Sequence, residues 1–134
     1  MKGISPYLLL QKINSNTISQ RELKQLIEVS YHIASSFLNN SYKSKFSNLI
    51  DNQDAIRDLS IDTILPLFIR NNSGILGIKR ALDNWNDPIL NDADVNFFLS
   101  KIIWKRADQT VTKLLKEQDP IFCKILKTLN LCFL

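Results

Sequence analysis

The sequence predicts an all-α domain, a compact orthogonal bundle of about five to six helices. Only three glycines and four prolines occur in 134 residues, so few residues interrupt helices. Apolar residues recur at intervals of three and four, as they do on one face of a helix. No alternation of apolar and polar residues persists long enough to predict a strand. The length fits one domain with a single hydrophobic core.

Residues 1–18 are expected to form an N-terminal arm or a short helix. Ser19 and Glu22 then have the spacing of a capping box, in which each side chain accepts a hydrogen bond from the other residue's backbone amide. A long amphipathic helix should follow, ending near residue 38. Its apolar positions are Leu23, Leu26, Ile27, Tyr31, Ala34, Phe37 and Leu38.

A second helical pattern covers residues 54–70, but Pro66 lies inside it. Proline lacks the amide hydrogen and clashes with the preceding turn, so we expect a kink or an early stop near residue 65. Asp58 and Asp62 are expected in the first half of this helix, where the helix dipole favours anions. A shorter helix is expected over residues 75–85.

The last long helix is expected to begin near Asp92 or Asp94, which would cap it, and to reach about Gln118. An Asp-Pro pair follows, and the residue before a proline avoids the helical conformation. Residues 119–134 are therefore expected to form a separate C-terminal helix that packs on the domain or leads to a missing segment. The main helical domain should span residues 19–118.

The chain lacks an apolar run of about 20 residues, the length that a membrane span requires, and lacks a secretory signal. We therefore expect a cytoplasmic protein with no membrane partner. Cys123 and Cys132 fit a reduced pair in an apolar core. His32 is the only histidine, and no glycine-rich phosphate loop occurs. These observations argue against an enzyme, and no metal or cofactor is expected.

The positive charge is concentrated at the C-terminal end. Residues 95–134 hold seven basic and three acidic side chains, which accounts for the whole net charge of +4. At about 100° per residue, five cations share one flank of the last long helix, and Trp104 lies at the edge of its apolar stripe. The stripe consists of Leu99, Ile103, Ala107, Val111, Leu114 and Leu115. The five cations are Lys101, Lys105, Arg106, Lys113 and Lys116. Such a flank is either a solvated face or a surface on which cations contact phosphates while an aromatic ring stacks on a base.

Two stretches together resemble region two of bacterial sigma factors of the sigma-70 family. DLSIDTILPLF, residues 58–68, is similar to the polymerase-binding helix of that region. The acidic-Leu pair Asp58-Leu59 and the acidic-Thr pair Asp62-Thr63 fall in register with it. VNFFLSKIIWKRADQ, residues 95–109, resembles the segment that opens and reads the promoter.

The resemblance covers roughly residues 20–118 and includes the stretch RALDNWND, residues 80–87. The chain departs from the family pattern at Ile61, where the family has a polar residue, at Pro66, and at Lys105. No second DNA-reading helix-turn-helix follows in the sequence. We therefore expect either a domain of a longer chain or a fold that serves another role.

The resemblance implies a sigma factor-like domain that acts by binding in transcription initiation or its regulation. The first of the two stretches would dock on the clamp helices of the largest RNA polymerase subunit, and the basic flank would face promoter DNA. The polymerase-binding residues would be Asp58, Leu59, Asp62 and Thr63. The DNA-binding residues would be Lys101, Trp104, Lys105, Arg106, Lys113 and Lys116.

Two alternatives stay open. One is a helical protein–protein interaction module of the same fold that does not bind DNA and contacts an unknown protein partner through the C-terminal helix. The other is an enzyme or small-molecule binder with a pocket between helices. The alternative interpretation of the first stretch is purely structural: Leu59, Ile64, Leu65 and Phe68 would be core residues, and Asp58 and Asp62 would serve the helix dipole.

Overall fold

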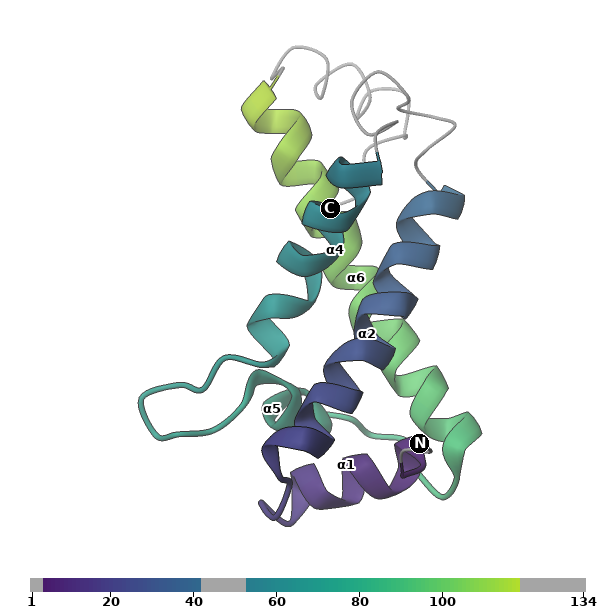
Figure 1. Ribbon diagram of the computed structural model, residues 1–134, viewed down its shortest axis with the longest axis vertical. Helices are drawn as coiled ribbons and strands as arrows, with labels where there is room; N and C mark the ends of the chain where they lie inside the picture. The colour runs from purple at the N-terminus through teal and green to yellow at the C-terminus, as the bar shows by residue number, and fades with distance from the viewer. Residues whose placement is uncertain (1–3, 42–52, 119–134) are drawn as a thin grey trace.

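The computed structural model describes residues 4–41 and 53–118, and it consists of five α-helices packed together (Figure 1). The elements are α1 (Pro6–Asn14), α2 (Gln20–Ser41), α4 (Gln53–Ile64), the 3-10 helix η1 (Leu65–Leu67), α5 (Gly77–Asp83) and α6 (Asp92–Gln118). These ranges contain no β-strand, and only an isolated bridge joins Arg70 to Leu76. The all-α prediction is confirmed.

The three long helices form the body of the molecule. In Figure 1, α2, α4 and α6 run along the long axis, and α1 crosses their lower end. Each of the three contacts the other two, while α1 contacts α2, α5 and α6. Within the described residues, no helix is long and apolar enough to cross a membrane.

The core lies where these helices meet. The predicted apolar stripe of α6 is confirmed for Leu99, Ile103, Ala107 and Val111, each at most 2% exposed. Phe98 is also fully buried, and it is the largest side chain of the core. Fully burying one side chain of the size of leucine or phenylalanine stabilises a fold by about 1.5–3 kcal/mol. The apolar face of α6 is therefore a main source of stability.

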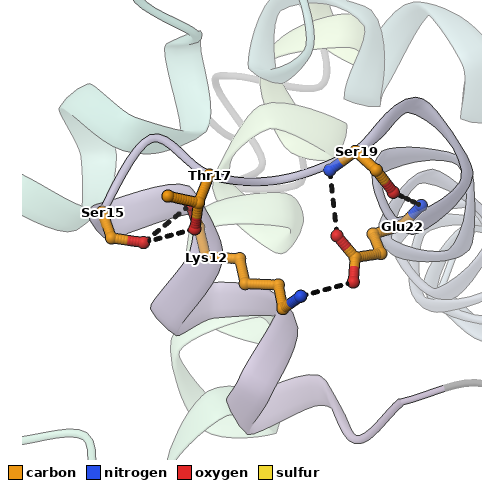
Figure 2. A network of polar contacts seen from close by, with 5 residues as sticks. All are labelled: Lys12, Ser15, Thr17, Ser19 and Glu22. Carbon is orange, nitrogen blue, oxygen red and sulfur yellow. Dashed lines mark hydrogen bonds and ion pairs between the residues drawn. The ribbon is translucent and has the colours of Figure 1, made fainter.

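The predicted capping box at the start of α2 is confirmed (Figure 2). The amide of Glu22 donates to the Ser19 hydroxyl at 3.1 Å, and the amide of Ser19 donates to the Glu22 carboxylate at 2.9 Å. The other carboxylate oxygen of Glu22 pairs with Lys12 Nζ at 2.7 Å. Since Lys12 belongs to the last turn of α1, this network fixes the junction between α1 and α2.

Pro66 ends α4 as predicted: the α-helix stops at Ile64, and the proline sits in η1. Because α4 stops there, Asp62 lies in its last turn, where the helix dipole disfavours an anion. The expectation that Asp62 lies in the first half of this helix is therefore wrong. The alternative that Asp62 serves the helix dipole fails for the same reason.

The helix expected over residues 75–85 is shorter than predicted. The bridge with Arg70 holds Leu76 in an extended conformation, so α5 begins only at Gly77. A Cβ atom at Gly77 would collide with the carbonyl oxygen of Pro66. This close approach explains why a glycine opens the helix.

The start of α6 uses its aspartates in two different ways. The Asp94 amide donates to the Asn91 side chain, and the Leu90 amide donates to the Asp94 carboxylate, both at 2.9 Å. Asn91 and Asp94 therefore form the cap of α6. Asp92 instead accepts a hydrogen bond from the Tyr7 amide at 2.9 Å, so it caps α1, which lies 85 residues earlier.

The expected C-terminal helix, residues 119–134, lies outside the described residues, and so do Cys123 and Cys132. The expected N-terminal arm or short helix is the helix α1, which packs against the rest of the bundle.

The Glu22 network predicts a pH-dependent stability. The hydrogen bond from Lys12, and then the one from the Ser19 amide, hold the pKa of Glu22 below its ordinary value. A carboxylate with a lowered pKa stabilises the fold above the unfolded pKa, about 4.3, and this contribution is lost as the pH falls through the folded pKa. We expect Glu22→Gln to lower the free energy of unfolding at neutral pH, and this deficit should shrink as the pH falls through the lowered pKa of Glu22.

Urea unfolding at several pH values measures this difference. Glu28→Gln is the matched control, because Glu28 is exposed on the same helix and has no ion pair among the described residues. Its unfolding curves should follow those of the parent chain at every pH. A Glu22→Gln deficit that persists unchanged in acid would contradict the assigned ionic contribution.

Candidate nucleic-acid interface

One face of the bundle combines aromatic rings with positive charge. Phe37 of α2 stacks on Trp104 of α6, with ring centroids 5.7 Å apart and planes 20° from parallel. Lys101 Nζ lies 5.4 Å from the centroid of Phe97 and 6.0 Å from that of Trp104. Both distances are in the range of cation–π interactions. We call Phe37, Phe97, Lys101 and Trp104, with the adjacent Lys105, the aromatic-basic face.

Two of the three rings of this face are exposed, whereas Phe37 is half-buried. Phe97 is 51% exposed and Trp104 is 40% exposed. Such exposure of two large aromatic side chains beside each other is unusual, because burying an aromatic ring stabilises a fold. Lys101 and Lys105 are exposed as well and lie one helical turn apart. The face therefore combines flat apolar surface with two cations.

The helical repeat explains this arrangement. Positions 97, 101 and 104 are spaced by four and three residues, so they lie on one side of α6. Phe98 points the other way, and its ring meets that of Trp85 edge to face at 5.1 Å. Trp85 also contacts Phe97, at 5.9 Å. Trp85 thus supports Phe97 from the side of the core while the ring stays accessible.

A shallow groove of about 410 Å³ lies beside the stacked pair, between α2 and α6. Its polar lining includes Ser36, Asn40 and Ser100, and Trp104 forms one of its walls. Hydroxyl and amide groups can donate and accept hydrogen bonds at the edge of a flat ligand. The groove therefore adds hydrogen-bonding groups to a surface that otherwise offers stacking and charge.

The other predicted DNA-binding residues do not join this face. Arg106 is half-buried, and burial, followed by the nearby charge of Arg80, lowers its pKa. Lys113 lines a pocket with Asp62 of α4, and it lies 12 residues along α6 from Lys101, a rise of about 18 Å. The side chain of Lys116 is outside the described part of the chain. The five cations therefore do not form one continuous surface, because Arg106 lies beside α5 and Lys113 lies beside α4.

Two of the four predicted polymerase-binding residues are exposed and the other two are buried. Asp58 and Asp62 are exposed on α4. Leu59 is only 6% exposed and Thr63 is fully buried, with its hydroxyl donating to the Leu59 carbonyl at 2.7 Å. In this conformation the side chains of Leu59 and Thr63 cannot contact a partner. Leu59 and Ile64 are core residues, as the alternative interpretation held, and Phe68 is half-buried. The same interpretation is wrong for Leu65, which is 49% exposed because α4 ends just before it and η1 turns its side chain outward.

Sequence reasoning missed an apolar groove of about 340 Å³ between α2 and α4. Ile61 and Leu65 are 43% and 49% exposed, respectively, and both line it. We call it the α2/α4 groove; its apolar lining is Ile27, Tyr31, Ile61, Ile64, Leu65 and Phe68. One signal was present in the sequence, since Ile61 stands where the resembling family has a polar residue.

The place of Phe37 in the aromatic-basic face was also missed. The sequence assigned it to the apolar stripe of α2, and its contact with Trp104 joins two distant helices. A search of the described residues finds no group of three His, Cys, Asp or Glu side chains that could hold a metal ion. Comparison of the chain with models of protein families, with curated proteins and with solved structures finds no match.

The position of Lys101 predicts that anions quench the fluorescence of Trp104 more strongly than cations do. The sequence has two tryptophans, so Trp85→Phe leaves Trp104 as the single tryptophan, whose fluorescence can be excited selectively over that of the three tyrosines. An ammonium group 6.0 Å from the ring should attract anions and repel cations. At low, constant ionic strength we expect iodide to quench this fluorescence about twice as strongly as caesium, or more.

Lys101→Gln in the Trp85→Phe background should bring the two quenching constants closer together. Lys113→Gln removes the same charge from the same helix at a distance from the ring, so it should leave their ratio unchanged. If iodide and caesium quench equally before any lysine is replaced, the geometry of Lys101 over Trp104 is incorrect in solution.

Proposed function

We propose that this chain is a sigma region 2-like domain that holds single-stranded promoter DNA on the aromatic-basic face and contacts RNA polymerase through α4. The observation that carries the proposal is Lys101, placed over two exposed rings, Phe97 and Trp104. This combination of rings and cation matches the chemistry of a nucleic-acid strand, whose flat bases alternate with negative phosphates. Binding without covalent chemistry is the proposed mechanism.

The exposed rings favour a single strand over a duplex. In a duplex the faces of the bases are covered by their stacked neighbours, whereas a melted strand leaves them free to stack on protein rings. Each base stacked on an aromatic side chain contributes about 1–3 kcal/mol. Trp104 and Phe97 therefore supply stacking energy that only the melted strand can use, which is the property that promoter opening requires.

Lys101 and Lys105 supply the charge. Lysine is a compact point charge on a flexible stem, so both ammonium groups can follow phosphates on either side of a stacked base. The α2/α6 groove beside Trp104 offers hydrogen bonds to the edge of a base through Ser36, Asn40 and Ser100. Two phosphate contacts give weak, salt-sensitive binding.

The polymerase contact of the proposal rests on Asp58 and Asp62 together with the resemblance of α4 to a polymerase-binding helix. Both carboxylates are exposed, and Asp62 has no ion pair among the described residues. An anion in the last turn of a helix does not stabilise that helix. Lys113 of α6 lines the same pocket as Asp62, and a basic partner surface would be a further contact for this carboxylate.

A second candidate function is a protein-interaction module that does not bind DNA. The α2/α4 groove favours it, because the exposed Ile61 and Leu65 form an apolar surface of the kind that binds a partner helix. The two functions differ in the surface they need. The first requires the aromatic-basic face, whereas the second requires only the α2/α4 groove.

The first prediction concerns DNA. We expect the whole chain to bind a labelled single strand of promoter-like sequence more tightly than the matching duplex. Lys101→Gln/Lys105→Gln should flatten the dependence of log K on log salt by about 0.7 for each lost phosphate contact. Trp104→Leu should weaken binding about tenfold at every salt concentration, since stacking is lost and the charge is kept. Fluorescence anisotropy measures both effects.

Lys113→Gln is the control for the charge variants, because Lys113 lies with Asp62 and away from the rings. Its salt dependence should equal that of the parent chain. Circular dichroism verifies that each variant is folded. Absence of single-strand binding at low salt, or equal losses in all lysine variants, would reject the aromatic-basic face as the binding surface and favour the second candidate function.

The second prediction concerns the polymerase. We expect the chain to co-purify with bacterial RNA polymerase core enzyme, and we expect Asp58→Lys/Asp62→Lys to reduce this association at least tenfold because it reverses the charge of the exposed side of α4. Asp87→Lys changes an exposed carboxylate elsewhere and should have no effect. Retained DNA binding without any polymerase association would restrict the function to a DNA-binding module.

A further inference from the structure

A small cavity lies at the lower end of the bundle, between α1, α5 and the connection that leads from α5 to α6 (Figure 1). Its volume is about 230 Å³, and α1 contributes Leu10, Gln11 and Asn14 to its lining. The lining shares no residue with the aromatic-basic face or with the α2/α4 groove. The cavity is therefore a separate place where a ligand can bind.

The apolar part of the lining is fixed by the core. Leu10 is 3% exposed and belongs to the hydrophobic core, while Leu82 and Ile89 are half-buried and pack against it. An apolar ligand atom that covers the remaining surface of these side chains is removed from water, which favours binding. Because this part of the lining is already packed, it is formed before any ligand arrives.

Three polar side chains of the lining have no partner within the described part of the chain. Asp87 is exposed, and it has neither an ion pair nor a hydrogen bond there. The side-chain amides of Gln11 and Asn14 lie one helical turn apart on α1 and make no hydrogen bond with a described residue. Asp87 is the only charged residue of the lining, and a carboxylate can only accept hydrogen bonds. The lining therefore favours a positively charged donor.

An aromatic ring completes the lining and favours the same kind of ligand. Trp85 is half-buried, and its ring is held by Phe98 and Phe97, with centroids at 5.1 Å and 5.9 Å. The face of a tryptophan ring attracts cations more strongly than that of tyrosine or phenylalanine. A carboxylate and an indole that line one cavity therefore both select a cation.

We propose that this cavity binds a primary ammonium group carried on a short alkyl chain. The ammonium group pairs with the Asp87 carboxylate and donates its other N–H bonds to the side-chain oxygens of Gln11 and Asn14. The alkyl chain covers Leu10 and the ring of Trp85. At about 30 Å³ for each group of the size of water, the cavity holds roughly seven non-hydrogen atoms, which is enough for an amine with a chain of about five carbons.

The test uses pentylamine, which carries an ammonium group on an apolar chain of suitable length. Trp104→Phe leaves Trp85 as the single tryptophan of the full chain, so tryptophan fluorescence reports on the cavity. We expect pentylamine hydrochloride, titrated at constant ionic strength, to change this fluorescence until it saturates. Pentanol has the same alkyl chain without the charge, so it should bind about tenfold more weakly. Calorimetry on the unmodified chain measures the same affinities without the substitution.

Asp87→Asn keeps the shape of the side chain and removes its charge, so it should lower the affinity for pentylamine about tenfold. Asp62→Asn is the matched control, because it makes the same change at an exposed carboxylate in another pocket, on α4. Its affinity should equal that of the Trp104→Phe chain. Gln11→Leu/Asn14→Leu should weaken the binding of pentylamine without weakening that of pentanol, since it removes polar groups only. Circular dichroism verifies that each variant is folded.

A fluorescence change that does not saturate would overturn the proposal, and so would equal affinities of Asp87→Asn and Asp62→Asn or equal binding of pentylamine and pentanol. A free diamine and the lysine side chain of a partner share the proposed chemistry. Cadaverine and acetyl-lysine amide with a free side-chain amine, titrated in the same way, distinguish these two sources by their affinity. The inference does not depend on the proposed function, and single-strand binding by the aromatic-basic face is measured separately, so either proposal can fail alone.

Discussion

The apolar face of α6 is the constraint on which the other elements depend. α1, α2 and α4 all pack against this one helix, and Val95, Phe98, Leu99 and Ile103 are fully buried in the contact. Once this face is fixed in the core, the rotation of the helix is fixed as well. Phe97 is then directed outward next to the buried Phe98, and it cannot be buried in the same way unless Phe98 leaves the core. The exposure of the aromatic-basic face is thus a consequence of how the core is built.

α2 connects the two surfaces that carry the functional proposals. Ile27 and Tyr31 line the α2/α4 groove, while Phe37 lies further along the same helix and stacks on Trp104. His32 borders both this groove and the one between α2 and α6. Apolar and charged ligands nevertheless have separate places to bind.

The features that follow from local rules could be predicted from the sequence. The Ser19–Glu22 cap, the stop at Pro66 and the bounds of α6 depend on residues within a turn or two of each other. Features that depend on tertiary neighbours could not. A resemblance aligns Thr63 with a family position, but it does not predict which way the side chain points. A helical wheel places Arg106 and Lys113 on one flank, but it contains no information on the neighbouring helices α5 and α4 that lie beside them. The likeness to sigma region two stays a prediction.

The hydrogen bond between the Tyr7 amide and Asp92 bears on the order in which the molecule assembles. α1 leaves the ribosome first, yet the carboxylate that completes its first turn is made 85 residues later. At about 5–20 residues per second the wait is roughly 4–17 s. A helix of nine residues is too short to persist alone in water, so α1 has no stable form during this interval. The first turn of α1 therefore gains this hydrogen bond only when the start of α6 has been synthesised and has reached it.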